Sequence, residues 1–276
     1  MKNIVQWSVN VLPWRLRRVV RTLPLLAPFQ RFLVRRFGSG NEFVHKINAG
    51  PARGLRVYIK LPRDKTIWTG TYEAGFAETL QAGVRADDVC YDIGVFRGFM
   101  SGVMALAGAK EVFMFEPLPA NIAEIERLIA LNSSLPLRLF MYAIGDRDGM
   151  IELEMMKDPS MSKIHESKFQ EKERGDQVMT VTMRSLDSLL DQRQLAPPDV
   201  IKVDVEGAEL NVLLGAEKTL RSYRPTIFLE AHSPNLSEDC ASLLTGLGYR
   251  VTVLARETVV GNHGDSAISH LLARHG

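Results

Sequence analysis

The chain has 276 residues, of which 46% are hydrophobic and 24% are charged, and its formal net charge at pH 7 is +2. This composition excludes a disordered or fibrous chain and is typical of a globular protein with one large hydrophobic core. The length fits one α/β domain with an extension.

The two cysteines fit no metal or disulfide framework. Cys90 falls in a strand pattern and Cys240 in a helical one, and their spacing suits neither zinc nor a disulfide. Both are therefore expected to behave as small apolar residues of the core. We expect a protein of the reducing cytoplasm.

Residues 1–40 form a basic segment without a single acid, which leaves the remainder of the chain net acidic. Apolar and cationic residues alternate in it, as in amphipathic helices that lie on anionic membranes. Arginines interrupt each apolar run well short of the roughly 20 residues of a membrane span, and they also argue against a signal peptide. The segment predicts a helical arm, with residues 1–37 contacting the inner face of a membrane; a helical cap or dimer arm is the alternative.

The arm is followed by a subregion, residues 41–88, that precedes the core. It begins after a hinge at 38–41, continues with an alternating edge-strand pattern at 55–61 and a loop at 62–64, and ends with a helix near 71–80. From residue 89 to 276, strand and helix patterns alternate. Strands are predicted near 89–93, 111–115, 137–142, 200–204, 225–230 and 249–254, and helices near 98–107, 119–132, 185–192, 208–221 and 236–247.

This alternation predicts a mostly parallel sheet with helices on both faces and a ligand site at the carboxyl ends of its strands. The first of these strands ends in Asp92 and a turn with Gly94 and Gly98, and the next ends at Glu116. Glycines allow close backbone approach, and an acid at that second strand end can accept hydrogen bonds from a ribose diol. Asp92 suits a cofactor with a cationic amino-acid end, such as S-adenosylmethionine, better than a pyrophosphate. Ordinary strand-to-helix turn chemistry is the alternative.

The stretch from Met150 to Thr180 is polar and aperiodic. It predicts either a mobile lid or acceptor-recognition loop, or a disordered excursion.

A third block, Ile201 to Glu209, completes a pattern that resembles the FkbM family of S-adenosylmethionine-dependent methyltransferases over residues 71–254. Other parts of the pattern are Asp92-Ile93-Gly94, Phe115-Glu116-Pro117, Asn121, Asn132, Ala143-Ile144-Gly145-Asp146, Gly149, Leu186-Asp187 and Leu229-Glu230-Ala231-His232. The resemblance implies the class I methyltransferase fold, a Rossmann-like seven-stranded sheet with one antiparallel strand near the C-terminus. Residues 249–254 and 267–272 are the candidates for its closing hairpin.

The resemblance also implies a set of cofactor-binding residues. Glu116 is expected to hold the ribose, and Ser101 to reach the carboxylate of the methionine part. The turn around that part is formed by Asp92, Gly94 and Gly98, and the adenine lies by Ala143 and Ile144, with Asp146 nearby. The chain departs from the family at Val95, Phe96 and Arg97, where small and amide residues are usual.

Asp204, Glu206 and His232 are the candidate bases for removing a proton from an acceptor hydroxyl. His232 has the most suitable unperturbed pKa, and its alternative role is a strand-end histidine bonded to Glu230. No metal is predicted, although this cluster has oxygen and imidazole ligands. We expect an O-methyltransferase for a saccharide or related natural product, without a nucleic-acid partner; a non-catalytic homologue blocked by Phe96 and Arg97 is the alternative. Neither the acceptor nor the oligomeric state follows from the sequence.

Overall fold

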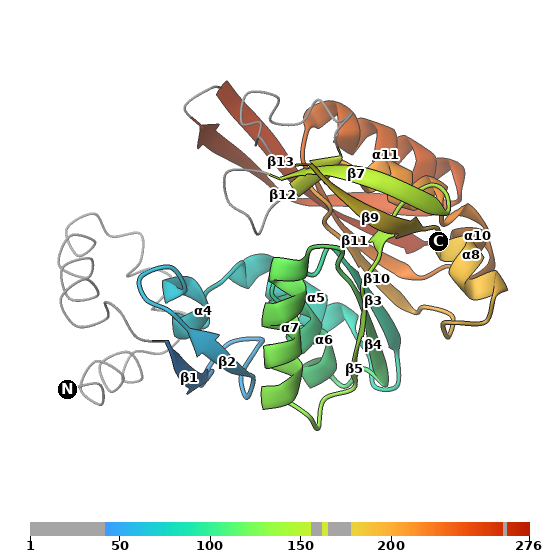
Figure 1. Cartoon of the computed structure of the whole chain (residues 1–276). Helices are drawn as coiled ribbons and strands as arrows, with labels where there is room; N and C mark the ends of the chain where they lie inside the picture. The colour runs from blue at the N-terminus through green and yellow to red at the C-terminus, as the bar shows by residue number, and fades with distance from the viewer. Residues whose placement is uncertain (1–41, 156–161, 165–177, 262–263) are drawn as a thin grey trace.

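The computed structural model describes residues 42–155, 162–164, 178–261 and 264–276 (Figure 1). The basic arm, the hinge after it and much of the 150–180 stretch lie outside these described residues, so the predictions made for them stay predictions. Within the described ranges, no helix has the length and apolar character needed to cross a membrane.

A seven-stranded sheet forms the centre of the protein (Figure 1), in the order β12-β13-β11-β10-β3-β4-β5. The strands are β3 (Val89–Ile93), β4 (Glu111–Phe115), β5 (Leu137–Phe140), β10 (Val200–Val203), β11 (Thr226–Ala231), β12 (Tyr249–Gly261) and β13 (Gly264–His275). Only β13 runs antiparallel to its neighbours among these seven strands. The predicted closing hairpin is therefore confirmed, and both of its strands are longer than expected.

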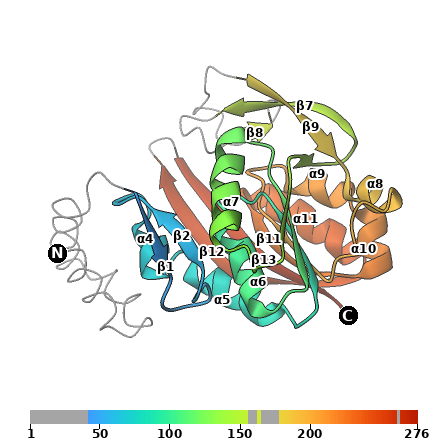
Figure 2. The ribbon, with the colours of Figure 1, turned by 60° about the horizontal axis from the view of Figure 1, so that its bottom comes forward.

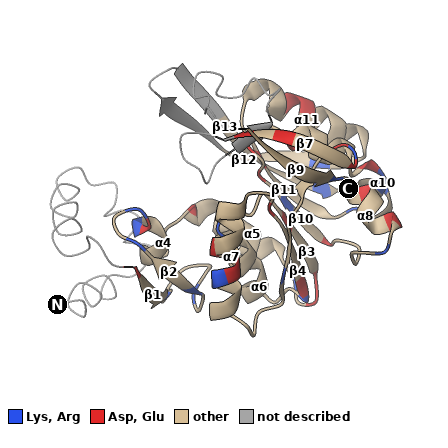
Figure 3. Cartoon of the chain, in the orientation of Figure 1, with Lys and Arg blue, Asp and Glu red and all other residues tan. Residues whose placement is uncertain are grey.

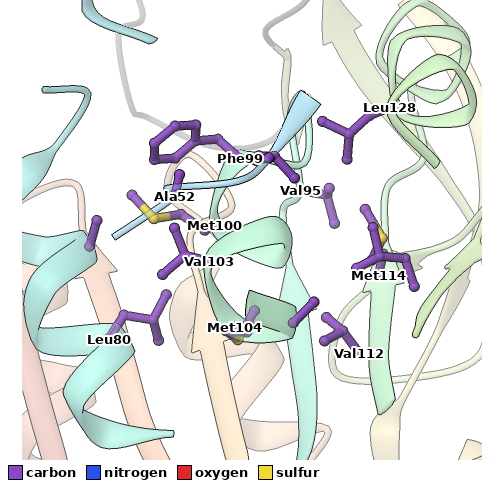
Figure 4. Close-up of a cluster of buried hydrophobic side chains, with 14 of the residues drawn as sticks. Ala52, Leu80, Val95, Phe99, Met100, Val103, Met104, Val112, Met114 and Leu128 are labelled. Carbon is purple, nitrogen blue, oxygen red and sulfur yellow. The ribbon is translucent and has the colours of Figure 1, made fainter. Parts of the chain in front are cut away.

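Helices cover both faces of this sheet (Figures 1 and 2). One layer holds α5 (Ala74–Gly83), α6 (Phe99–Ala107) and α7 (Pro119–Leu131), and the other holds α8 (Leu186–Asp191), α9 (Glu209–Leu214), α10 (Glu217–Tyr223) and α11 (Pro234–Gly246). Successive strand residues point to opposite faces, so Cys90 joins the first apolar cluster and Tyr91 the second. Figure 4 shows the first cluster, in which Val103 of α6 lies beside Met100 and Met104 lies on the side toward Val112. Cys90 and Cys240 are both fully buried thiols, as expected.

The subregion before the core holds a separate small sheet. Its strands β1 (Phe43–Lys46) and β2 (Arg56–Ile59) pair antiparallel. Asn132 at the end of α7 fixes this sheet to the core, because its side chain bonds both the N–H and the C=O of Arg56, at 2.9 and 2.7 Å. A short helix, α4 (Lys65–Thr69), follows the predicted loop at 62–64. The next helix, α5, begins at Ala74 after a left-handed residue, Glu73.

The prediction of an irregular stretch at 150–180 is wrong for its described parts. β7 (Gly149–Met155), β8 (Ser162–Ile164) and β9 (Val178–Arg184) form a second sheet with β6 (Ala143–Ile144), in the order β6-β9-β7-β8. Leu153 and Val181 pack on Leu118, while polar residues take the alternate positions. The large apolar residues Met150 and Val178 occupy exposed positions of this small sheet, which breaks the apolar–polar alternation in the sequence.

The helix predicted at 208–221 is divided at Gly215 into α9 and α10. A Cβ at Gly215 would lie 1.9 Å from the carbonyl oxygen of Gly145, so this position admits no side chain. Asp187 caps the second half by accepting bonds from the N–H groups of Lys218 and Thr219.

Candidate active site

The turn after β3 is built on close backbone approach. Gly94 has φ +79°, and a Cβ there would lie 1.6 Å from the carbonyl oxygen of Asp204, at the end of the neighbouring strand. Phe96 also has a positive φ, 55°, which is uncommon for a bulky residue. The turn therefore holds two neighbouring strand ends together.

Glu116, directly after β4, fastens this turn from the other side. Its carboxylate accepts hydrogen bonds from the N–H groups of Phe96, at 2.9 Å, and Leu118, at 3.0 Å. Only 4% of Glu116 is exposed. Burial raises its pKa to about 7, although those two N–H groups and the side chain of Asn121 favour the charged form.

Glu116 lies on the wall of a cavity of about 260 Å³ at the carboxyl ends of the central strands. Gly94 and Phe96 line it from the turn after β3, and Asp204 and Glu206 from the loop after β10. The second sheet forms another part of the wall, through Ala143, Ile144, Ile151, Leu153 and Met183. The cavity therefore joins a carboxylate-rich side to an apolar side.

A buried ion network lies behind this cavity. Charged residues occupy only short stretches of the ribbon in Figure 3, and two of them, Asp92 and Lys202, are almost wholly buried. The ammonium of Lys202 lies 3.1 Å from Asp92 and 3.3 Å from Asp204, and it donates to the carbonyl oxygen of Gly94 at 2.7 Å. Burial alone would lower the pKa of Lys202, but the charges of Asp92 and Asp204 raise it well above its usual value. Lys202 is thus paired with two acids.

Ser101 is fully buried, and its hydroxyl donates to the other oxygen of Asp92 at 2.5 Å. Ser101 and Asp92 are not among the residues that line the cavity, so the structure gives both a supporting position under the turn.

His232 follows β11 and is buried among carboxylates. Its Nδ1 lies 2.8 Å from Glu209, and its Nε2 lies 3.5 to 3.6 Å from Glu206, Asp204 and Glu230. The alternative role given by the sequence, a hydrogen bond to Glu230, is therefore replaced by a hydrogen bond to Glu209. Burial alone would lower the pKa of His232, but the hydrogen bond and charge of Glu209, with Asp204 and Glu206, raise it to about 10.

A histidine with this pKa is a cation at neutral pH and has no lone pair to accept a proton or bind a metal. Three possible ligand atoms, one each from Asp204, Glu230 and His232, lie within 4.8 Å of one another. A cation could bind at this spacing. The protonated imidazole supplies a positive charge next to these carboxylates.

The charge of His232 predicts a pH-dependent stability. The folded pKa is near 10 and the unfolded one near 6.5, so the contribution of His232 is complete below pH 6.5 and declines as pH rises to 10. We expect the difference in unfolding free energy between wild type and His232→Gln to shrink by roughly 1.4 kcal/mol per pH unit across this window. Urea unfolding at pH 6.5, 8 and 9.5 measures it. The control is His275→Gln, at the chain end, and a constant difference for His232→Gln would contradict the cationic state.

Arg97 does not block the cavity. Its guanidinium binds Asp64 at 2.6 Å and lies 3.5 Å from Glu124, and Arg97 is absent from the lining. Phe96 lines the cavity, yet the space remains open. The obstruction considered from the sequence is therefore not found.

The structure brings six of the predicted site residues together around the cavity. They are Gly94, Glu116, Ala143, Ile144, Asp204 and Glu206. Asp92, Gly98, Ser101, Asp146 and His232 are not in its lining. Asp146 pairs with its neighbour Arg147. Two acids near the cavity, Glu73 and Glu209, were not predicted as site residues from the sequence. Glu73 lies in a helical pattern, and only the folded structure shows that it lines the cavity.

Gly98 caps α6 in the left-handed region, with φ +80°. A Cβ there would lie 2.9 Å from a methyl group of Leu128. We expect Gly98→Ala to lower the unfolding free energy by about 1–2 kcal/mol, because alanine disfavours this φ. Gly246→Ala in α11 is the control, since a Cβ there meets nothing within 4 Å, and it should stabilise by up to about 1 kcal/mol. Effects of the same sign at both positions, measured by urea unfolding, would contradict this reasoning.

A sheet of this order, with one antiparallel strand and a cavity beside a buried acid after β4, defines a class I methyltransferase fold. Residues 88–251 match the Methyltransferase FkbM domain, and the chain belongs to this family of enzymes. Membership implies S-adenosylmethionine as the methyl donor.

Two characterised proteins are similar in sequence. The hexuronic acid methyltransferase AglP of Haloferax volcanii is 30% identical over 175 residues, covering 62% of this chain and 68% of the relative. The 2-O-methyltransferase NoeI of Sinorhizobium fredii is 31% identical over 154 residues, covering 51% of this chain and 62% of the relative. The chain thus spans about two thirds of the length of each.

Solved structures with similar chains include an FkbM methyltransferase from Methylobacillus flagellatus, with a TM-score of 0.45, 13% identity, and coverage of 89% of this chain and 58% of that one. A precorrin-6y C5,15-methyltransferase from Geobacter metallireducens has a TM-score of 0.46 and 15% identity, with coverage of 72% and 87%.

Proposed function

We propose that this enzyme transfers a methyl group from S-adenosylmethionine to a hydroxyl of a saccharide or a related natural product. The observation that carries the proposal is the buried carboxylate of Glu116 on the wall of a cavity at the carboxyl ends of the parallel strands. Ligands of open α/β sheets bind at this edge.

The residues around the cavity fit the chemistry of S-adenosylmethionine. Glu116 has lone pairs left for the two hydroxyls of a ribose, beyond the two backbone N–H groups that it accepts. Ile144 and Leu153 offer an apolar wall to an adenine. Asp204 offers a carboxylate to an ammonium group. When bound, the cofactor supplies an electrophilic methyl group, so the protein mainly aligns the acceptor and removes its proton.

The names of the two sequence relatives support a sugar acceptor. One is described as a hexuronic acid methyltransferase and the other as a 2-O-methyltransferase. Both descriptions agree with transfer to a hydroxyl-rich acceptor, which the sequence pattern alone also predicted.

Calorimetric titration with S-adenosylmethionine and S-adenosylhomocysteine tests the cofactor half of the proposal. Saturable binding of both is expected. The acceptor half is tested by incubating the full chain with S-adenosylmethionine and a panel of sugars, and detecting methylated products by mass spectrometry. A well-folded protein that binds neither cofactor form would favour the non-catalytic homologue.

A further inference from the structure

A second cavity, of about 550 Å³, adjoins the first. Tyr72 and Glu73, just before α5, line both cavities. The other walls of the second cavity include Thr66, Thr71, Phe76, Thr79, Leu254 and His270. The two cavities therefore meet at one carboxylate.

Glu73 is held in an unusual conformation at this meeting point. It has φ 39° and ψ 43°, in the left-handed region that few residues other than glycine adopt, and it starts α5 from there. Strain of this kind often marks functional sites. Glu73 is an exposed residue that lines both cavities, so a ligand in either one can reach it.

We propose that the second cavity binds the acceptor as a neutral sugar ring, and that Glu73 is the base that removes the proton from its reacting hydroxyl. The inference rests on the proposed function. It assigns the first cavity to the cofactor and the second to the acceptor, with the reaction at their shared wall.

The lining of the second cavity suits an uncharged, hydroxyl-rich ring. The hydroxyl oxygens of Thr66, Thr71 and Thr79 can accept hydrogen bonds from a sugar, although Thr79 donates its own proton to the carbonyl of Gly75. Phe76 and Leu254 offer apolar contact to the C–H face of a ring. Among the described residues that line it, none is a lysine or arginine. The carboxylate of Glu73, with Glu230 behind it, disfavours an acidic sugar in this space.

Glu73 is better placed for this role than the acids predicted from the sequence. Asp204 lies 3.3 Å from the ammonium of Lys202, and Glu206 lies 3.5 Å from the cationic His232. Both line the first cavity only. Burial, then the charges of Glu230 and Asp204, raise the pKa of Glu73 to about 7, although it is accessible from the cavities. A base of this pKa is effective at neutral pH.

In the methyl transfer, the bond that forms is matched by one that breaks. A lone pair of the sugar oxygen forms a bond to the methyl carbon of S-adenosylmethionine, while the carbon–sulfur bond breaks with its electrons on sulfur. The hydroxyl proton passes to the carboxylate of Glu73, which releases it to water after the products leave.

Ligand-observed NMR in the presence of S-adenosylhomocysteine tests the cavity. The probes are the methyl glycosides of glucose, galactose, mannose and rhamnose, with glucuronic and galacturonic acids for comparison. We expect at least one neutral glycoside to bind the full chain, at least tenfold tighter than either acid. Thr79→Phe fills the cavity and should abolish this binding, with the affinity for S-adenosylhomocysteine unchanged.

Thr245→Phe is the matched control, because Thr245 is an exposed helix residue whose hydroxyl also bonds the carbonyl four residues earlier. Binding of no neutral glycoside, tighter binding of an acid, or retained binding in Thr79→Phe would each overturn the acceptor site. Absence of S-adenosylhomocysteine binding in wild type would instead overturn the proposed function.

Turnover of the bound glycoside tests Glu73. We expect Glu73→Gln to lower kcat at least 100-fold at pH 8, with S-adenosylhomocysteine affinity within twofold of wild type. The wild-type rate should rise through pH 7, and this limb should be absent from the residual rate of the variant. The titratable and charged groups that face Glu73 are Tyr72, Asp204, Lys202, Glu230 and, across the second cavity, His270. Full turnover in Glu73→Gln, or an unchanged acid limb, would overturn the assignment.

Discussion

Replacing Lys202 by methionine should destabilise the protein by about 3–5 kcal/mol, which is among the largest effects expected of any single substitution here. The side chain of Lys202 is 4% exposed and that of Asp92 not at all. Removing the ammonium leaves Asp92 buried opposite Asp204 without a cation, and it also removes the donor to the carbonyl oxygen of Gly94. Urea unfolding at pH 7 measures the loss.

Two further variants separate the buried pair from a general effect of losing a charge. Lys218→Met removes an exposed pair with Asp191, and it should cost less than about 0.5 kcal/mol. Asp92→Asn added to Lys202→Met should recover part of the loss, because it removes the charge left without a partner. A loss below about 1 kcal/mol in Lys202→Met, or no recovery in the double variant, would contradict this account.

The central sheet was predictable because its signals are local. β3, β4 and β10 are mostly apolar runs with one charged residue each, and the helices that follow them carry periodic apolar positions, so these strands were found within a few residues. The stretch around β7 to β9 was not found, since the exposed apolar residues Met150 and Val178 break the alternation of apolar and polar residues, and the pairing joins segments far apart in the chain. The same applies to Gly215, whose role depends on contact with Gly145.

The residues of the candidate site also fall into those that the sequence could predict and those that it could not. Residues at strand ends, such as Glu116 and Asp204, could be placed from the sequence because parallel strands end at one edge of the sheet. The protonation state of His232 could not, since it depends on three carboxylates contributed by other segments. Glu73 could not be found either, because its place between two cavities follows from the left-handed start of α5 and from the position of β12 and β13.

The small sheet of β6 to β9 changes how the first cavity is understood. It places Ile151, Leu153 and Met183 over the edge where the central strands end, so the cavity has an apolar cover in addition to its polar floor. A cover of this kind lowers the local dielectric constant, which strengthens each hydrogen bond to the carboxylate of Glu116. The affinity for the cofactor should therefore depend strongly on that carboxylate.

Glu116→Gln should weaken binding of S-adenosylmethionine about 100-fold, or close to 2.7 kcal/mol, because a glutamine loses charge-assisted bonds to the ribose. Its amide nitrogen would also face the N–H of Phe96 or Leu118. Calorimetric titration at pH 8 measures the loss. Glu111→Gln is the matched control, since Glu111 begins the same strand that Glu116 follows and should leave the affinity unchanged.

The raised pKa of Glu116 adds a pH dependence that the variant should lack. With a pKa of about 7, the carboxylate is mostly charged at pH 8 and mostly protonated at pH 6, so wild-type affinity should fall about tenfold between these values. Glutamine does not titrate, and Glu116→Gln should show a flat profile over the same range. Equal affinities for wild type and Glu116→Gln, or parallel pH profiles, would show that the carboxylate does not contact the cofactor.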